Sequence, residues 1–292
     1  MSYIDLHVHS TFSDGSYTPE ELVDYAIEKG LKAFALTDHD TTDGIKYALS
    51  HINKRNDKAG KTLITLVPGI ELSTVYQGCD IHILGYCIDY NNKNFLDTVS
   101  YYRDSRNKRN EKMEAVLREN GFNITTERLK KRFGEDTVIT RAHYAILMVE
   151  DGVCKDKNEA FEIFLNPGCP CYVDRMKIPS EKAVDLILSA HGKPVLAHPC
   201  MYPISYDKIR ELVTLLKEHG LMGIEGIYSC NTTKDDIEIA SIAKDFDLFI
   251  TGGSDFHGTA KPDIDLGVGH GNLKIPESIL DNILQKKVMP ID

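Results

Sequence analysis

Short apolar runs alternate with amphipathic stretches along most of the chain, which is the pattern of β-α units around a parallel sheet. The first run, residues 3–9, alternates apolar and polar positions as a strand does. A helix is predicted to follow it, because Thr18 can cap a helix that starts at Pro19 and Gly30 can end it. The same patterns predict further strands at 33–37, 63–67, 81–86, 194–197, 223–228 and 248–251, and helices at 45–52, 180–190, 207–218, 233–244 and 276–286. We therefore expect an α/β fold with about seven β-α units.

Residues 95–170 break this rhythm and are predicted to be helical throughout. The expected helices cover 96–119, a short stretch after Thr126, 141–150 and 157–165. The first carries many cations, for which a solvated helix face is the simplest interpretation. They are Arg103, Arg106, Lys108, Arg109, Lys112 and Arg118. We divide the chain into a barrel domain, 1–94 with 171–292, and a helical insertion, 95–170, that caps one end of it.

Length and composition fit this division. The 292 residues, 42% of them hydrophobic, suffice for a barrel-sized core with an insertion. No basic and apolar leader opens the sequence, no apolar run reaches membrane-spanning length, and the seven scattered cysteines favour reduced thiols. We expect a cytoplasmic protein without membrane association.

The net charge of −10 argues against a general nucleic-acid-binding surface. It does not exclude an anionic substrate, because metal ions can dominate the field inside a cleft.

Histidines and carboxylates gather where predicted strands end. His7 and His9 are two apart on one strand, so both imidazoles face the same side and can reach one ion. In α/β proteins the carboxyl ends of the strands are where sites are built. The candidate metal ligands at or near these ends are His7, His9, Asp14, His39, Glu71, His82, His198, Asp255 and His257.

Imidazoles and carboxylates together suit zinc, manganese or iron, whereas calcium prefers an all-oxygen shell. A single histidine on a strand is usually structural, and a structural zinc needs only four ligands, mostly cysteines, which are not suitably spaced in this sequence. The size of the set therefore favours a catalytic metal centre. Asp38 and Asp40 flank His39 and are candidates to orient imidazoles, or, for Asp40, to cap a helix.

Seven segments resemble the PHP family, the polymerase and histidinol phosphatase family. They occur from Asp5 to Gly258 in the family's order: D-L-H-V-H-S-x-x-S-D-G, L-T-D-H-D-T, P-G-I-E-L-S, H-I-L-G-Y, R-A-H, L-A-H-P and G-G-S-D-F-H-G. More narrowly, they resemble the stand-alone phosphoesterases that act on nucleoside 3′,5′-bisphosphates or trim RNA from its 5′ end.

The resemblance implies a distorted (β/α)7 barrel with a helical cap and two or three divalent ions, manganese, iron or zinc. Glu71 would bridge the first two ions. Carried over to this sequence, the ligands would be His7, His9, Glu71 and Asp255 for one ion, Glu71, His82 and His198 for a second, and Asp14, His39 and His257 for a third.

Such ions can activate a water for attack on phosphorus and neutralise the phosphoryl oxygens. The expected catalytic groups are that metal-bound water with Asp14, His39, Glu71 and His257. No G-x-S-x-G motif supports a serine nucleophile instead.

Three residues are candidates for substrate binding. Arg141 opens a predicted helix, and arginine suits bidentate phosphate recognition, although an ion pair with an acidic neighbour is the alternative. His143 follows in the same Arg-Ala-His segment. Glu225 lies in a Gly-Ile-Glu segment that, by the resemblance, is near the mouth of the site.

The leading hypothesis is a metal-dependent hydrolase that removes the 3′-phosphate of nucleoside 3′,5′-bisphosphates, extending to 5′→3′ trimming of short RNA. A cap carrying Arg141 favours it, because a cap can bind a second phosphate. The alternatives are a histidinol-phosphate-type monophosphatase, a non-catalytic metal-binding PHP module and an amide-bond hydrolase. The expected partner is a small phosphorylated nucleotide or short RNA, with no stable protein partner.

Overall fold

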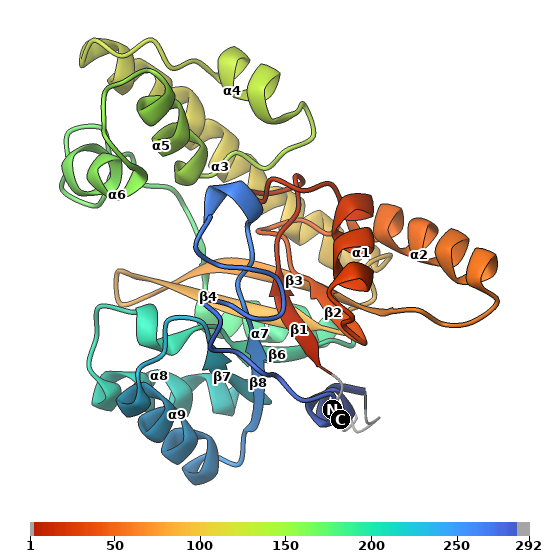
Figure 1. The fold of residues 1–292 in the computed structure, drawn as a ribbon. Coiled ribbons are helices and arrows are strands. Elements are labelled where there is room, and N and C mark those ends of the chain that lie inside the picture. The colour runs from red at the N-terminus through yellow and green to blue at the C-terminus, as the bar shows by residue number, and fades with distance from the viewer. Residues whose placement is uncertain (1–2, 285–292) are drawn as a thin grey trace.

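The computed structural model describes residues 3–284, and its centre is a nearly closed, barrel-like sheet (Figure 1). The strands follow the order β1-β2-β3-β4-β6-β7-β8, and the short β5 pairs with β3 outside this path. The α/β barrel predicted from the sequence is confirmed. The strands are β1 Ile4–Val8, β2 Ala33–Leu36, β3 Thr65–Tyr76, β4 Cys79–Tyr86, β5 Ile178–Pro179, β6 Lys193–Leu196, β7 Gly223–Tyr228 and β8 Phe249–Gly253.

The barrel closes between its first and last strands. The backbone amide of His9 donates to the carbonyl of Phe256, 3.0 Å away, just beyond β8. Gly253 makes this approach possible, because a Cβ at that position would lie 2.2 Å from the Cβ of His7. The seam therefore brings the Asp255 loop directly beside the first two histidines.

One strand departs from the predicted β-α alternation. β4 is antiparallel to both β3 and β6, and no helix separates it from β3. Gln77 and Gly78 both have positive φ, 48° and 80°, which matches a tight hairpin turn that the sequence analysis missed. The hairpin pairs Ser73 with His82, so His82 lies beside Glu71.

Helices cover the outside of the barrel, and the predicted start of the first is confirmed, with Thr18 and Glu21 forming a capping box. Apolar side chains fill both the layer between helices and sheet and the barrel interior. The last predicted helix extends beyond the described residues. The covering helices are α1 Pro19–Glu28, α2 Ile45–Ala59, α7 Ser180–Ser189, α8 Tyr206–Glu218, α9 Thr233–Asp245 and α10 Ser278–Leu284.

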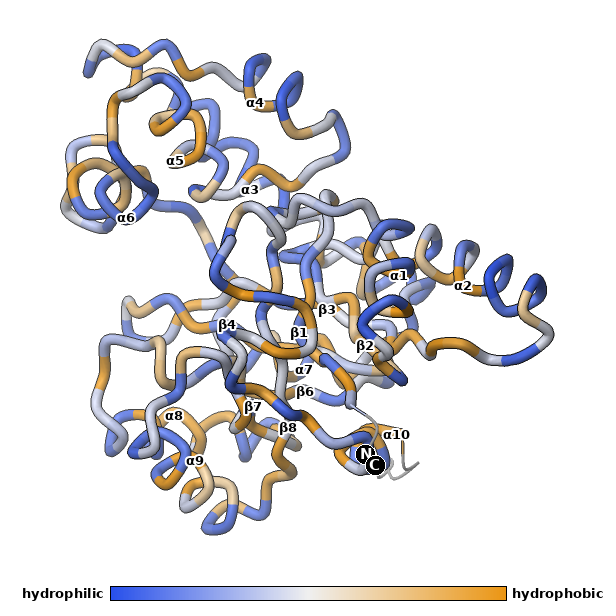
Figure 2. Tube along the Cα trace, in the orientation of Figure 1, coloured by the Kyte–Doolittle hydropathy of each residue, from blue (hydrophilic) through white to orange (hydrophobic). Residues whose placement is uncertain are grey.

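Four helices form a cap over the end of the barrel that carries the candidate ligands (Figure 1). They enclose an apolar cluster of their own, seen as orange segments among blue ones in Figure 2. No helix within residues 3–284 is long and apolar enough to cross a bilayer. The cap helices are α3 Lys93–Glu119, α4 Thr126–Phe133, α5 Arg141–Glu150 and α6 Lys157–Ala160, which continues into a π-helical turn, Phe161–Leu165.

The solvated face predicted for the first cap helix is wrong for two of its arginines. Arg106 and Arg109 of α3 are buried, 5% and 4% exposed, where the helix packs on the barrel. Arg106 donates to the Asp40 carboxylate and to Ser73 Oγ, 3.0 Å away. Periodicity could not separate these two cations from the exposed ones, because their burial depends on the barrel beneath them.

Asp40 anchors the cap to the barrel. Besides Arg106, it accepts from Arg175 Nη2 at 3.3 Å on the segment that returns to β5. Despite burial, the two guanidinium groups hold the pKa of Asp40 well below its usual range. Neither role predicted for Asp40 is confirmed, because its carboxylate is engaged by these arginines and the N-cap of α2 is Gly44.

We predict that Asp40→Asn lowers the free energy of unfolding by about 3–5 kcal/mol, because it leaves two buried guanidinium groups without a charged partner. The contribution is complete above about pH 4 and is lost at lower pH, since the folded pKa lies below the unfolded one. Urea unfolding at pH 7 measures it. Asp43→Asn, in a half-exposed pair with Arg103, is the control and should cost less than about 1 kcal/mol. Equal effects of the two changes would contradict the anchor.

Candidate metal centre

A single carboxylate, that of Glu71, lies at the centre of the site. It is 1% exposed, at the point where β3 leaves the parallel part of the sheet. Imidazole nitrogens face both of its oxygens. Oε1 is 2.8 Å from His82 Nδ1 and 3.0 Å from His198 Nε2, and Oε2 is 3.0 Å from His39 Nδ1, 3.2 Å from His9 Nε2 and 3.3 Å from His7 Nε2.

The two remaining candidate carboxylates complete the cluster. Asp14 Oδ1 is 3.2 Å from His257 Nε2, and Asp255 Oδ1 is 3.4 Å from His9 Nε2. The structure thus brings together all nine residues that the sequence singled out as metal ligands. Their ligand atoms form four overlapping groups, each within 4.8 Å: His9, Asp14, His39 and His257; His7, Glu71 and His198; His7, His9 and Asp255; and His39, Glu71 and His82.

The donor atoms of this cluster fit divalent cations. Several of them are buried without a hydrogen-bond partner among the described residues, although leaving such groups unpaired is costly. Because they converge on the same small space, ions bound there would satisfy them together. The unpartnered atoms that face the cluster are His7 Nε2, His9 Nε2, Asp14 Oδ1, His39 Nδ1 and Glu71 Oε2.

The charges of the cluster are coupled. Burial opposes protonation of His9, but its contacts with Asp255 and Glu71 raise its pKa to about 9. Burial lowers the pKa of His39 to about 3. Despite burial, the surrounding imidazoles, His39 first among them, hold the pKa of Glu71 well below its usual range. The carboxylates are therefore ionised and able to bind cations.

Two ligands occupy strained backbone positions just beyond strand ends. His198 has φ of 21° and Asp255 has φ of 59°, values that non-glycine residues rarely adopt. Such positions recur where a side chain must be aimed at a site.

Glu225 was expected near the mouth of the site, where it would contact substrate, but it lies behind the candidate ligands. Its carboxylate is fully buried behind the cluster, with Oε1 3.0 Å from His7 Nδ1 and Oε2 accepting the backbone amide of His198 at 2.8 Å. A carboxylate there fixes the ring of one ligand and the backbone of another. The Gly-Ile-Glu segment identified Glu225 as a candidate site residue, but the sequence could not show that its carboxylate faces His7 and His198 rather than the substrate.

Asp38 supports His9 through an intermediate hydroxyl. It accepts from Ser13 Oγ at 2.6 Å, and that oxygen is 3.3 Å from His9 Nδ1. The expectation that Asp38 orients an imidazole is thus met, for His9 rather than its neighbour His39. Asp255 is held by Tyr228 and Lys261, which donate to its Oδ2 at 2.8 and 2.6 Å. No motif pointed to these two.

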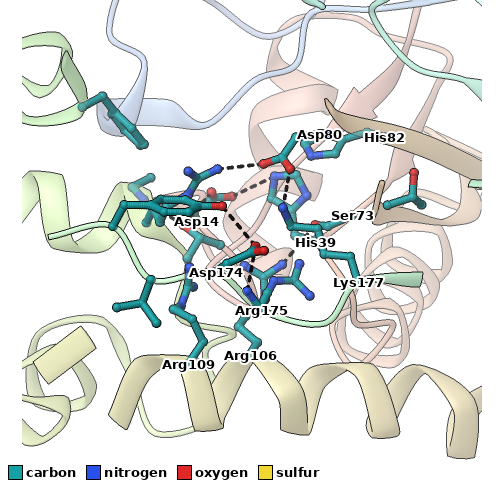
Figure 3. Close-up of a pocket in the computed structure, with 17 residues that line it drawn as sticks. Asp14, His39, Ser73, Asp80, His82, Arg106, Arg109, Asp174, Arg175 and Lys177 are labelled. Carbon is teal, nitrogen blue, oxygen red and sulfur yellow. Dashed lines mark hydrogen bonds and ion pairs between the residues drawn. The ribbon is translucent and has the colours of Figure 1, made fainter. Parts of the chain in front are cut away.

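A cationic pocket opens beside the cluster under the cap (Figure 3). We call it the cap pocket; its volume is about 190 Å³, and His39 and His82 form one end of it. Arg141, a predicted substrate contact, lines it and pairs with Asp80 at 2.9 Å, the ion pair expected as the alternative. The cations lining it are Arg106, Arg109, Arg141, Arg175 and Lys177.

Arg109 is the arginine of this pocket that has no carboxylate partner among the described residues. Its Nη2 is buried without a partner among residues 3–284, and its Nε donates only to Asn110 Oδ1 at 2.9 Å. Burial and the neighbouring Arg106 lower its pKa to about 9. The sequence analysis did not single out Arg109 as a site residue.

His143 lies outside the cap pocket. It is buried, its Nδ1 accepts from the backbone amide of Thr140 at 2.9 Å, and it completes the capping box of α5. Its Nδ1 thus has a structural role that the sequence analysis did not anticipate, because Thr140 and His143 are three residues apart, which is the spacing of a capping box. A substrate contact of His143 stays a prediction.

Comparison with known proteins agrees with the fold and the ligand cluster. The PHP domain matches residues 5–150. The chain is 33% identical over 263 residues to the 5′-3′ exoribonuclease Rnm of Escherichia coli, covering 90% of this chain and 87% of that protein. It is 32% identical over 267 residues to a 3′,5′-nucleoside bisphosphate phosphatase of Chromobacterium violaceum, covering 91% of each.

A solved structure of a Chromobacterium violaceum amidohydrolase with bound sulfate and no metal superposes with a TM-score of 0.84 at 30% identity, covering 97% of this chain and 98% of that one. Fold, ligand cluster and relatives together define a metal-dependent phosphoesterase. The chain belongs to the PHP family.

We predict that Glu225→Gln weakens metal binding about 10- to 100-fold, because the amide no longer holds His7 as a carboxylate does. Titration of the metal-free protein with manganese measures the affinity, and Glu218→Gln on the exposed end of α8 is the control. A change in KM with unaltered metal affinity would restore Glu225 as a substrate contact.

Proposed function

We propose that this enzyme removes the 3′-phosphate of nucleoside 3′,5′-bisphosphates and trims short RNA from its 5′ end. Two of its relatives carry these activities in their names. The observation that carries the proposal is the cap pocket, which joins a phosphate-sized cationic space to the metal-ligand cluster through His39 and His82. A substrate with two phosphates would then place one at the ligands and one under the cap.

We propose that the candidate ligands hold divalent ions in the grouping that the family resemblance implies, in which two ions would share Glu71 and Asp14 would bind a third. Manganese, iron and zinc all suit such imidazole and carboxylate donors. When bound, the ions supply a low-pKa water and charge neutralisation for the phosphoryl oxygens. The proposed ligands are His7, His9, Asp14, His39, Glu71, His82, His198, Asp255 and His257.

Residues of the chain set up the reacting side of the cluster. His257 Nδ1 lies 2.8 Å from the carbonyl of Asp255, which can only accept, so Nδ1 carries the proton. The Nε2 lone pair of His257 therefore faces Asp14, and Asp14 is fixed in turn by Thr140, whose hydroxyl donates to Oδ2 at 3.0 Å. We assign Asp14, His39, Glu71 and His257 to this reacting side.

The cap pocket selects for a second anion. Its five cations outnumber the four carboxylates in or beside it, which are Asp14, Asp40, Asp80 and Asp174. Guanidinium groups bind phosphate oxygens in pairs, and Arg109 has donors to spare. Histidinol phosphate is a poor candidate, because its own ammonium group would lie among these cations.

We further propose that residues 95–170 form the substrate-binding cap of a barrel made by 1–94 and 171–292. The separate apolar cluster of the cap supports this division. The expected site of action is the cytoplasm.

The proposed function is tested by phosphate release from a nucleoside 3′,5′-bisphosphate, a nucleoside 3′-monophosphate and histidinol phosphate, each with manganese. We expect the bisphosphate to have a kcat/KM at least about tenfold above that of the 3′-monophosphate, because only it can occupy the cap pocket. Faster turnover of histidinol phosphate than of either nucleotide would overturn the proposal.

We predict that Arg141→Ala raises KM for the bisphosphate about tenfold or more, while the metal content is unchanged, because a charge-assisted phosphate contact is lost. KM for the 3′-monophosphate should change little. Arg118→Ala, an exposed arginine at the far end of α3, is the control. Unaltered kinetics on the bisphosphate would contradict a phosphate contact and leave Arg141 with only its ion pair to Asp80.

A further inference from the structure

Besides the pocket that six of the candidate ligands line, a separate pocket meets the cluster at Asp14. We call it the loop pocket; it has a volume of about 280 Å³ and lies between the loop of residues 11–16, Thr259 and the cap helices α4 and α5. Asp14 is the one described residue that lines both this pocket and the cap pocket. The two pockets therefore meet at a candidate metal ligand and extend away from it along separate walls.

The lining of the loop pocket suits a nucleotide. Phe133 forms a half-buried aromatic wall, and Thr11 and Ser16 add hydroxyl groups to the lining. The Phe133 ring centroid is 4.4 Å from that of His143, and the Arg132 guanidinium lies 5.1 Å from it, so a base would stack on the part of the ring that these groups leave open. Aromatic rings of this kind stack on nucleobases, and hydroxyl groups bind sugar and phosphate oxygens. The charge of Arg132 is taken up by Glu150, at 3.0 Å.

Lys157 is the free cation of the loop pocket. It opens α6, and its ammonium has no hydrogen-bond or ion-pair partner in the part of the chain that the structure describes. Burial and the nearby Lys261 lower its pKa, whereas Asp14 raises it. Lys157 and the candidate ligand Asp14 line the same pocket, so the ammonium and the edge of the cluster face one space.

The chemistry of the proposed function requires such a space. In a nucleoside 3′,5′-bisphosphate and in RNA the same P–O3′ bond breaks: the hydroxyl of water joins phosphorus, and O3′ takes up the remaining proton. In RNA the phosphoryl group at the cluster also carries the O5′ of the next nucleotide. With the first 5′-phosphate in the cap pocket, that next nucleotide must extend from the cluster along another wall.

We infer that the loop pocket binds the nucleotide on the 3′ side of the scissile phosphate of an RNA substrate, with Lys157 contacting the phosphate that follows it. The inference rests on the proposed function and extends it. The cap pocket binds the 5′-phosphate, which bisphosphates and RNA share. The loop pocket binds the next nucleotide, which only RNA has. Lys157 then determines whether the enzyme accepts a chain as well as a single nucleotide.

The test compares a 5′-phosphorylated RNA trinucleotide with a nucleoside 3′,5′-bisphosphate, both with manganese. Lys157→Ala should lower kcat/KM for the trinucleotide about tenfold and change that for the bisphosphate less than about twofold, because one charged phosphate contact is lost. Lys155→Ala, two residues earlier and exposed, is the matched control and should alter neither.

Binding of the labelled trinucleotide to metal-free protein, followed by fluorescence anisotropy, gives a second measurement that does not depend on turnover. The dissociation constant should rise about tenfold in Lys157→Ala. Phe133→Leu, which keeps an apolar side chain in the cap, should weaken the same binding by losing the stacking surface.

Equal losses on both substrates, or no loss on either, would overturn the inference. Wild-type protein that hydrolyses the bisphosphate but not the trinucleotide would overturn it too, while leaving the phosphatase proposal intact. Wild-type protein that hydrolyses neither would overturn the proposed function itself.

Discussion

The structure depends on one buried carboxylate with imidazoles on both of its oxygens. Glu71 can occupy that position only because β3 leaves the parallel sheet there and continues into a hairpin that returns His82 to its side. The seam between β1 and β8 supplies His7, His9 and the Asp255 loop from the opposite direction. Cations bound beside this carboxylate would satisfy the unpartnered donor atoms around it.

The cap and the barrel form one functional unit through neighbouring residues of a single loop. His39 faces Glu71, and the next residue, Asp40, holds the arginines of α3 and of the return segment. The same contact that fixes the cap thus lies beside a metal ligand. Asp14, a candidate ligand, lines both the cap pocket and the loop pocket, so each pocket has one wall in the cap and one in the barrel.

The sequence predicted the cluster well because its signal is local. Most candidate ligands lie at or just beyond the carboxyl end of a parallel strand, and such ends meet at one end of a barrel. His82 is the exception, because it lies within the antiparallel β4. The hairpin was missed because Gln77-Gly78 is a weak turn signal, and the burial of Arg106 and Arg109 was missed because it depends on the barrel surface under α3. Glu225 and His143 were assigned from the segments that resemble the family, but the structure turns Glu225 towards His7 and uses His143 Nδ1 to cap α5 with Thr140.

The most direct test of this account is the position of bound metal. Anomalous diffraction from crystals soaked in manganese should show ions against the Glu71 carboxylate, one on the Oε1 side with His82 and His198 and one on the Oε2 side with His7 and His9. No peak at Glu71, or manganese bound only elsewhere on the chain, would contradict it.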